Sequence, residues 1–332
     1  MSATGQNITA LTRQLSPRDN LRVLLRAFIG PRHARRLHRY YLENARTIKA
    51  GLDVIASRWP MLASKSDAAP IFVFSAGWRS GSTLLQRMIL ASNEVFMWGE
   101  PYRHSALIDS LGKQVRAITY KNPGDGSFVK GFGGSELSRQ WVANLYPEMQ
   151  SFLDAHVQFF ECLFARLPEG ADVTRWGIKE VTLGVDHAHY LKWLFPQAKF
   201  VFLMRNPYDS YRSYRQWSAW YKSWPAEPVF TPTAFGRLWR GLAEDYAAHH
   251  AQVGGLLLRY EQLAAPETGE MLHEYLDCPV AHPHDLPRID RPAHALGSVP
   301  KWLPKIERAL LRHQVEPVAS ACGYLHESAP RQ

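Results

Sequence analysis

The sequence predicts an α/β fold of three layers, with a central parallel sheet and a helical extension at the N-terminus. Short, continuous apolar runs recur along the chain, as in strands that are buried on both faces. Helical patterns separate these runs, and strands that alternate with helices are typical of a parallel sheet covered on both sides. The predicted strands span residues 71–74, 176–181, 199–204 and 254–260.

The first 65 residues are predicted to form a basic helical extension. Ser16 and Pro17 are a helix start, because a capping hydroxyl precedes proline at the first helical position. A second helix is expected over residues 32–59. Residues 11–50 hold ten Lys or Arg and two acidic residues, so they carry most of the net charge of +9. We interpret them as a solvated face packed on the main domain; contact with an anionic membrane surface is the alternative.

Composition narrows the class of protein. The chain of 332 residues is 46% hydrophobic and 21% charged, which is typical of a globular protein. Its cysteines are few and widely spaced, which argues against a disulfide framework and favours a reducing compartment; they are Cys162, Cys278 and Cys322. No apolar run reaches the ~18 residues of a membrane span, and the N-terminus has no apolar signal core. We therefore expect a cytoplasmic protein.

The helices between the strands are predicted from the helical spacing of apolar residues and from the glycines and prolines that break it. A helix is expected over 82–92, directly after the first strand. Residues 105–150 are rich in glycine in their middle, which favours a loop, interpreted as a lid. Further helices are expected over residues 151–167, 187–195 and 208–221.

The turn after the first strand predicts a cradle for a phosphate or sulfate group. Residues 75–84 read Ser-Ala-Gly-Trp-Arg-Ser-Gly-Ser-Thr-Leu. Small residues let backbone N–H groups approach an anion, and the following helix N-terminus adds partial positive charge. Arg79 adds a fixed cation. The turn also supplies three hydroxyl groups, those of Ser80, Ser82 and Thr83.

This turn is P-loop-like in position but lacks the kinase pattern, G-x-x-x-x-G-K-[ST]. Gly77 and Gly81 are one residue too close together, and no lysine precedes Ser82. The predicted strand 199–204 ends in Arg205 instead of an aspartate that holds Mg²⁺. Arginine at this place suits transfer of an anionic group without a metal, so no metal ion is expected.

Two motifs resemble those of the sulfotransferases that use 3′-phosphoadenosine 5′-phosphosulfate (PAPS). Gly-Trp-Arg-Ser-Gly-Ser-Thr-Leu-Leu, from Gly77, resembles their 5′-phosphosulfate loop, in the arginine form of the tyrosylprotein, carbohydrate and many bacterial members. Arg205-Asn-Pro, with Ser213 eight residues after the arginine, resembles their 3′-phosphate motif. The resemblance implies PAPS as co-substrate, a catalytic domain over residues 66–332, and donor contacts from Arg79, Ser80, Gly81, Ser82, Thr83, Leu84, Arg205 and Ser213.

Two weaker matches extend the resemblance. Tyr260, in Leu-Arg-Tyr-Glu-Gln-Leu, resembles a family tyrosine that lies near the adenine. Lys301, before Trp302, resembles a late lysine that reaches the co-substrate; a surface lysine beside a core tryptophan is the alternative. The motifs together run from residue 71 to residue 302.

The resemblance also suggests the catalytic groups. Glu100 lies 21 residues after Arg79, where the tyrosylprotein-like branch has its general base; a cap or a structural salt bridge is the alternative, and His104 is the second candidate. Arg79 is placed to neutralise the departing phosphate. Lys179 resembles a family lysine at the matching place, and a surface lysine paired with Glu180 is the alternative.

The acceptor is less determined than the donor. We expect Trp98, His104, Trp217 and Trp220 to line its pocket, because aromatic rings stack on sugars or aromatic groups. A hydroxyl group of a carbohydrate, glycolipid or small molecule is favoured over an amine. A phenolic natural product or a peptide tyrosine is the alternative acceptor. A P-loop kinase and a protein that binds anions or nucleic acid are the alternative classes, and nucleic acid is not expected as a partner.

Overall fold

The computed structural model describes residues 44–102, 105–129, 145–170, 175–216, 229–287 and 303–324, and also Leu21, Leu24, Arg139 and Val173. Five parallel strands form its sheet, in the order β2-β3-β1-β4-β5. The strands are β1 Ile71–Ser75, β2 Val95–Trp98, β3 Arg175–Glu180, β4 Lys199–Met204 and β5 Leu256–Arg259. The predicted α/β fold with a central parallel sheet is confirmed, and each apolar run identified in the sequence is a strand.

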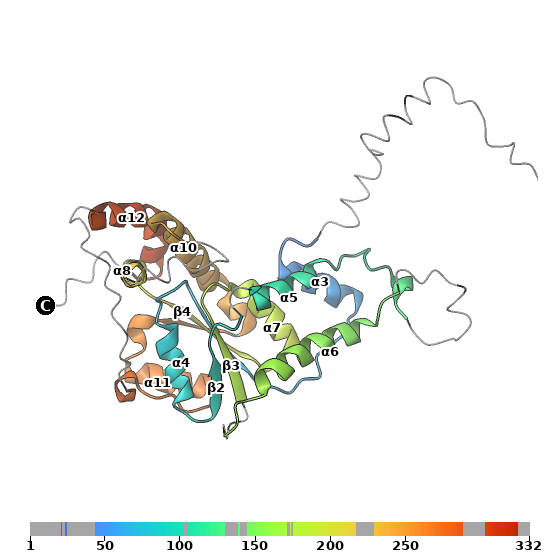
Figure 1. Cartoon of the computed structure of the whole chain (residues 1–332), viewed down its shortest axis with the longest axis horizontal. Coiled ribbons are helices and arrows are strands. Elements are labelled where there is room, and N and C mark those ends of the chain that lie inside the picture. The colour runs from blue at the N-terminus through green and yellow to red at the C-terminus, as the bar shows by residue number, and fades with distance from the viewer. Residues whose placement is uncertain are drawn as a thin grey trace, which may run out of the picture.

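The two faces of the sheet are covered by different helices (Figure 1). Phe72 and Phe74 of β1 face a core that also holds side chains of three helices; these are α6 Met149–Phe160, α7 Val185–Leu194 and α10 Pro232–His249. Ile71 and Val73 face the opposite core, which is completed by α4 Ser82–Leu90 and α11 Pro266–Leu276. The alternation along β1 thus gives the three layers, because successive side chains of a strand point to opposite faces.

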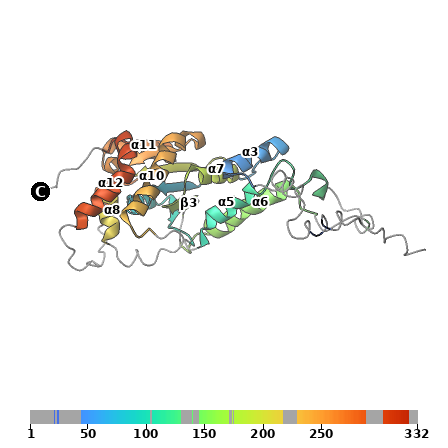
Figure 2. The same ribbon diagram turned by 90° about the horizontal axis from the view of Figure 1, so that it is seen from above.

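Four further helices flank these layers: α3 Ile48–Arg58, α5 Leu107–Arg116, α8 Pro207–Arg215 and α12 Leu303–Ala321. Figures 1 and 2 both place α3 and α6 at one end of the molecule and α8 and α12 at the other. At the first end, Ile48 and Ile55 of α3 are buried in the same core as Phe72. No helix in the described parts of the chain combines the length and apolar character needed to cross a membrane.

The prediction of one helix over residues 32–59 is wrong at residues 44–47, which are not helical. The helix begins at Ile48 because Thr47 caps it, with its hydroxyl accepting a hydrogen bond from the Ala50 N–H. The carboxylate of Asp186 accepts from the N–H groups of Ile48 and Lys49, at 2.7 and 2.8 Å. A side chain distant in sequence thus sets the helix start. Residues 32–43 lie outside the described part, as does most of the basic segment 11–50.

The prediction of a loop over residues 105–150 is also wrong in part, because α5 lies within it. Ile108 and Val115 are buried on one face of this helix. Gly112 lies between them, and a Cβ there would come within 2.7 Å of the Ile48 side chain. The glycine therefore serves close packing of α5 on α3. After α5, residues 117–129 hold one turn of 3₁₀ helix, Asp125–Ser127, and an isolated bridge from Phe128 to Tyr146.

Candidate functional site

The loop between β1 and α4 has an unusual backbone. Gly77, Arg79 and Gly81 all adopt left-handed conformations, with φ of 78°, 64° and 90°. The Ser80 hydroxyl lies within hydrogen-bonding distance of two carbonyl oxygens, those of Ala76 (3.0 Å) and Gly77 (2.8 Å). Positive φ at Arg79 is uncommon for a residue with a side chain. These features hold the loop in a compact turn around the start of α4.

The start of α4 is uncapped by any side chain. Its N-cap residue is Gly81, which has no side chain to accept a hydrogen bond. The first N–H groups of a helix have no intrahelical acceptor, and they attract anions together with the helix dipole. The structure thus places a helix start without a side-chain cap at the turn where the sequence predicts an anion site.

Arg205 and Tyr260 close one side of this helix end. A Cβ at Gly81 would lie 2.1 Å from the Tyr260 ring, so only glycine lets the ring approach so closely. The Arg205 guanidinium lies 4.3 Å from the centre of that ring, and its Nη1 donates to the Arg79 carbonyl at 2.9 Å. Arg205 Nε is buried and has no hydrogen-bond partner among the described residues. A donor of Arg205 is therefore available beside the loop.

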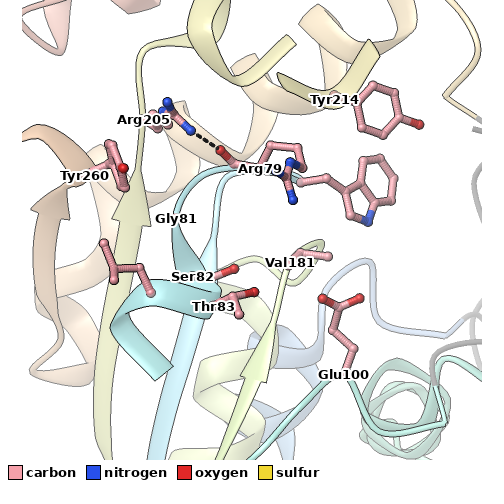
Figure 3. A pocket seen from close by; sticks show the side chains of 11 residues that line it. Arg79, Gly81, Ser82, Thr83, Glu100, Val181, Arg205, Tyr214 and Tyr260 are labelled. Atoms are coloured by element: carbon pink, nitrogen blue, oxygen red, sulfur yellow. Dashed lines mark hydrogen bonds between the residues drawn. The ribbon is translucent and has the colours of Figure 1, made fainter. Parts of the chain in front are cut away.

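A cavity of about 210 Å³ lies at the carboxyl ends of the strands (Figure 3). Its walls bring together the loop, the start of α4 and residues that follow β2, β3, β4 and β5. The lining residues are Trp78, Arg79, Gly81, Ser82, Thr83, Leu84, Glu100, Val181, Arg205, Tyr214 and Tyr260. In Figure 3, Arg205 and Tyr260 lie on one side of the cavity and Glu100 on another. Cationic groups and one carboxylate thus share a single space.

Lys179 and Glu100 form an ion pair beside the cavity. Lys179 Nζ contacts Glu100 Oε1, and both side chains are largely buried. The alternative in which Lys179 is a surface lysine paired with Glu180 is wrong, because the Lys179 side chain is buried and its amino group contacts Glu100. Glu100 therefore forms the salt bridge that was its alternative role, and its partner in that salt bridge is Lys179, the other candidate catalytic residue.

Glu180 is the last residue of β3 and was not among the site residues predicted from the sequence. Burial and the nearby Glu100 carboxylate raise the pKa of Glu180 to about 8, with Lys179 opposing the shift. Glu180 pairs in register with Phe74, so its side chain lies on the aromatic face of the sheet. The only signal in the sequence was a carboxyl group at the end of a buried strand.

Ser213 contacts the loop. Its Oγ accepts a hydrogen bond from Arg79 Nε at 2.9 Å. Both motifs that the sequence singled out, about 130 residues apart in the chain, therefore meet at one contact.

The acceptor side differs from the prediction. Trp98 does not line the cavity; its indole N–H donates to the Phe164 carbonyl at 2.8 Å. Trp78 and Tyr214 line it instead, with ring centres 5.5 Å apart and planes 23° from parallel. Sequence reasoning missed Trp78 because its contact with Tyr214 is long-range. The predictions for His104, Trp217, Trp220 and Lys301 lie outside the described residues.

Among the described residues, no three His, Cys, Asp or Glu side chains are grouped so as to hold a metal ion.

Comparisons with known proteins place the chain in a family. No curated protein matches its sequence. Solved structures similar to it include the sulfotransferase domain from the curacin biosynthetic pathway, with 17% identity, a TM-score of 0.42, and coverage of 78% of this chain and 99% of that one. The sulfotransferase from Alicyclobacillus acidocaldarius has 13% identity, a TM-score of 0.40, and coverage of 78% and 98%. The sequence model of the sulfotransferase family matches residues 70–281, more than half of the chain. The chain therefore belongs to the sulfotransferase family.

Proposed function

We propose that this protein transfers the sulfuryl group of PAPS to a hydroxyl group of a carbohydrate, glycolipid or small-molecule acceptor, and releases adenosine 3′,5′-bisphosphate. The observation that carries the proposal is the cavity, which joins the uncapped start of α4, Arg205 and the Glu100 carboxylate. Phosphate groups need the first two, and an acceptor hydroxyl needs a base. PAPS supplies the activated sulfuryl group.

The residues on the donor side fit a nucleotide with phosphates at both ends of its ribose. The start of α4, with the hydroxyl groups of Ser82 and Thr83, holds the 5′-phosphosulfate end. Arg205 holds the 3′-phosphate. This role is supported by its Nε, which has no hydrogen-bond partner among the described residues. Tyr260 lines the cavity beside Gly81, and its ring contacts the adenine.

The catalytic roles follow from position and charge. Glu100 accepts the proton of the acceptor hydroxyl, and its ion pair with Lys179 supports a carboxylate ready to do so. Arg79 lies in the loop where negative charge develops on the leaving phosphate, and it stabilises that charge. Lys179 is the second cation at this point. A proton acceptor and two cations thus surround the position of the sulfuryl group.

The acceptor enters on the side of Glu100. Trp78 and Tyr214 supply aromatic surface there, which supports a ring-shaped acceptor, either a sugar or a phenol. Phenols therefore belong beside carbohydrates in a screen for the acceptor.

Calorimetric titration without metal tests the donor. We expect tight binding of adenosine 3′,5′-bisphosphate and weak binding of ATP with Mg²⁺. Acceptors would then be screened with sulfur-labelled PAPS, with and without EDTA. Preference for ATP with Mg²⁺ would contradict the proposal and favour a kinase.

A further inference from the structure

The peptide unit that joins Arg205 to Asn206 lies just beyond the end of the sheet. Met204, the last residue of β4, pairs in register with Arg259, the last residue of β5. α8 begins at Pro207, and Asn206 is its N-cap. The peptide therefore lies between two regular elements. Because Asn206 is buried, its backbone groups need hydrogen-bond partners from elsewhere in the protein.

Two side chains bind this peptide from opposite sides. Trp239 of α10 is fully buried and donates its indole N–H to the Arg205 carbonyl at 3.0 Å. Glu261 Oε1 accepts a hydrogen bond from the Asn206 N–H, also at 3.0 Å. The C=O and N–H groups of a planar trans peptide point in opposite directions. The two contacts therefore fix the plane of the peptide at both of its polar ends.

Glu261 lies in the 3₁₀ turn that directly follows β5. Gln262 closes this turn, because its Oε1 accepts a hydrogen bond from the Arg259 N–H at 3.1 Å. Tyr260 of the same turn lies under the Arg205 guanidinium, 4.3 Å from it to the ring centre. One short turn thus contacts Arg205 through its side chain and, at the next peptide, through the backbone.

The backbone at this peptide decides where the Arg205 guanidinium lies. Arg205 lines the cavity, and its Nη1 donates to the Arg79 carbonyl at 2.9 Å. A guanidinium binds a phosphate strongly only when its N–H groups are aligned with the phosphate oxygens. Loss of one of the two anchors would let the segment between β4 and α8 shift, and the guanidinium would shift with it.

We propose that Glu261 and Trp239 are positioning residues, which hold the backbone at Arg205 so that its guanidinium meets the 3′-phosphate of the donor. Neither is among the described residues that line the cavity, so both act through Arg205 and not on the ligand. The inference rests on the proposed function, because it takes Arg205 to be the contact of the 3′-phosphate.

Calorimetric titration with adenosine 3′,5′-bisphosphate and with adenosine 5′-phosphate tests the role of Glu261. We expect Glu261→Ala to bind the bisphosphate about tenfold more weakly, and adenosine 5′-phosphate within about twofold of the wild type. Glu261→Gln keeps an acceptor oxygen and should restore most of the affinity. Both variants remove the charge, so the difference between them measures the hydrogen bond. Glu270→Ala, at an exposed glutamate of α11, is the matched control and should follow the wild type.

A double-mutant cycle tests whether Glu261 acts through Arg205. In an Arg205→Ala background, Glu261→Ala should weaken bisphosphate binding by less than about twofold, because the guanidinium that it positions is absent. Trp239→Phe removes the indole N–H and keeps an aromatic ring. With its folding checked by urea denaturation, it should discriminate between the two ligands as Glu261→Ala does.

The outcomes separate this inference from the proposed function. Unchanged bisphosphate affinity in Glu261→Ala, or an equal loss for the two ligands, overturns the inference and leaves the donor as proposed. The same tenfold loss with and without the Arg205 side chain overturns it too. A wild type that does not bind the bisphosphate overturns both.

Discussion

The carboxyl end of β3 and the interface between α6 and α7 both bury ionisable side chains, but only the first borders the cavity. At the helix interface, His156 Nδ1 and the Tyr190 hydroxyl are 2.6 Å apart. Burial lowers the pKa of His156 to about 4 and raises that of Tyr190. At the strand end, burial raises the pKa of Glu180. A shifted pKa thus marks burial in both regions and does not by itself mark function.

The two regions differ in what compensates the buried groups. His156 and Tyr190 satisfy each other while neutral, and aromatic rings such as Phe152 and Phe160 surround them. The strand end instead holds the charged pair of Lys179 and Glu100, and Val181, two residues after Lys179, accepts a hydrogen bond from the Gly77 N–H of the loop. We therefore expect changes at the strand end to alter ligand binding and turnover, and changes at the helix interface to alter stability alone.

The largest expected effect is that of Glu100→Gln on turnover. Loss of the base should lower kcat by about 10²- to 10⁴-fold, while affinity for adenosine 3′,5′-bisphosphate stays within a fewfold of the wild type. Steady-state rates with labelled PAPS and titration of the bisphosphate measure the two quantities. Turnover close to that of the wild type would remove Glu100 from this role and bring His104 forward.

Arg205→Ala should act next most strongly, and on binding. Loss of a charge-assisted contact to the 3′-phosphate should weaken binding of the bisphosphate by about 30- to 100-fold. Adenosine 5′-phosphate, which lacks only the 3′-phosphate, is the matched ligand and should lose little affinity. Calorimetry of both ligands on both proteins completes the comparison. Equal losses for the two would show that Arg205 does not read the 3′-phosphate.

The smallest effects are on stability, and they have opposite signs in the two regions. The pKa of Glu180 is raised from 4.5 to about 8, so the free energy of unfolding falls as pH rises between those values. The pKa of His156 is lowered from 6.5 to about 4, so the free energy of unfolding falls as pH falls between those values.

Urea denaturation from pH 4 to pH 9 measures these contributions. Glu180→Gln should gain stability over the wild type as pH rises above about 4.5, and the two should converge at pH 4. In His156→Gln, the free energy of unfolding should no longer decline below pH 6.5 because of this residue, and bisphosphate binding should stay unchanged. A His156 variant that binds the bisphosphate more weakly would break the distinction between the two regions.

Features built from residues close together in the sequence could be predicted from it. The apolar runs predicted β1, β3, β4 and β5 but not β2, and the loop from Ser75 and the motif from Arg205 supplied residues that line the cavity. Each depends on backbone geometry over at most about ten residues, such as the left-handed turns of the loop. α5 was missed because the glycine-rich middle of residues 105–150 favours a loop over the whole segment, whereas α5 precedes those glycines and packs closely on α3 at Gly112.

Contacts between residues distant in the sequence could not be predicted from it, and these contacts decide which side chains interact in the site. The sequence by itself determined the fold class, the family and the turn between β1 and α4, because local spacing encodes them. Only the tertiary structure paired Lys179 with Glu100, stacked Trp78 on Tyr214 and placed the Trp98 side chain away from the cavity. The physical reason is that burial and long-range contact set the charge and orientation of these side chains, and both arise only when the strands align in one sheet.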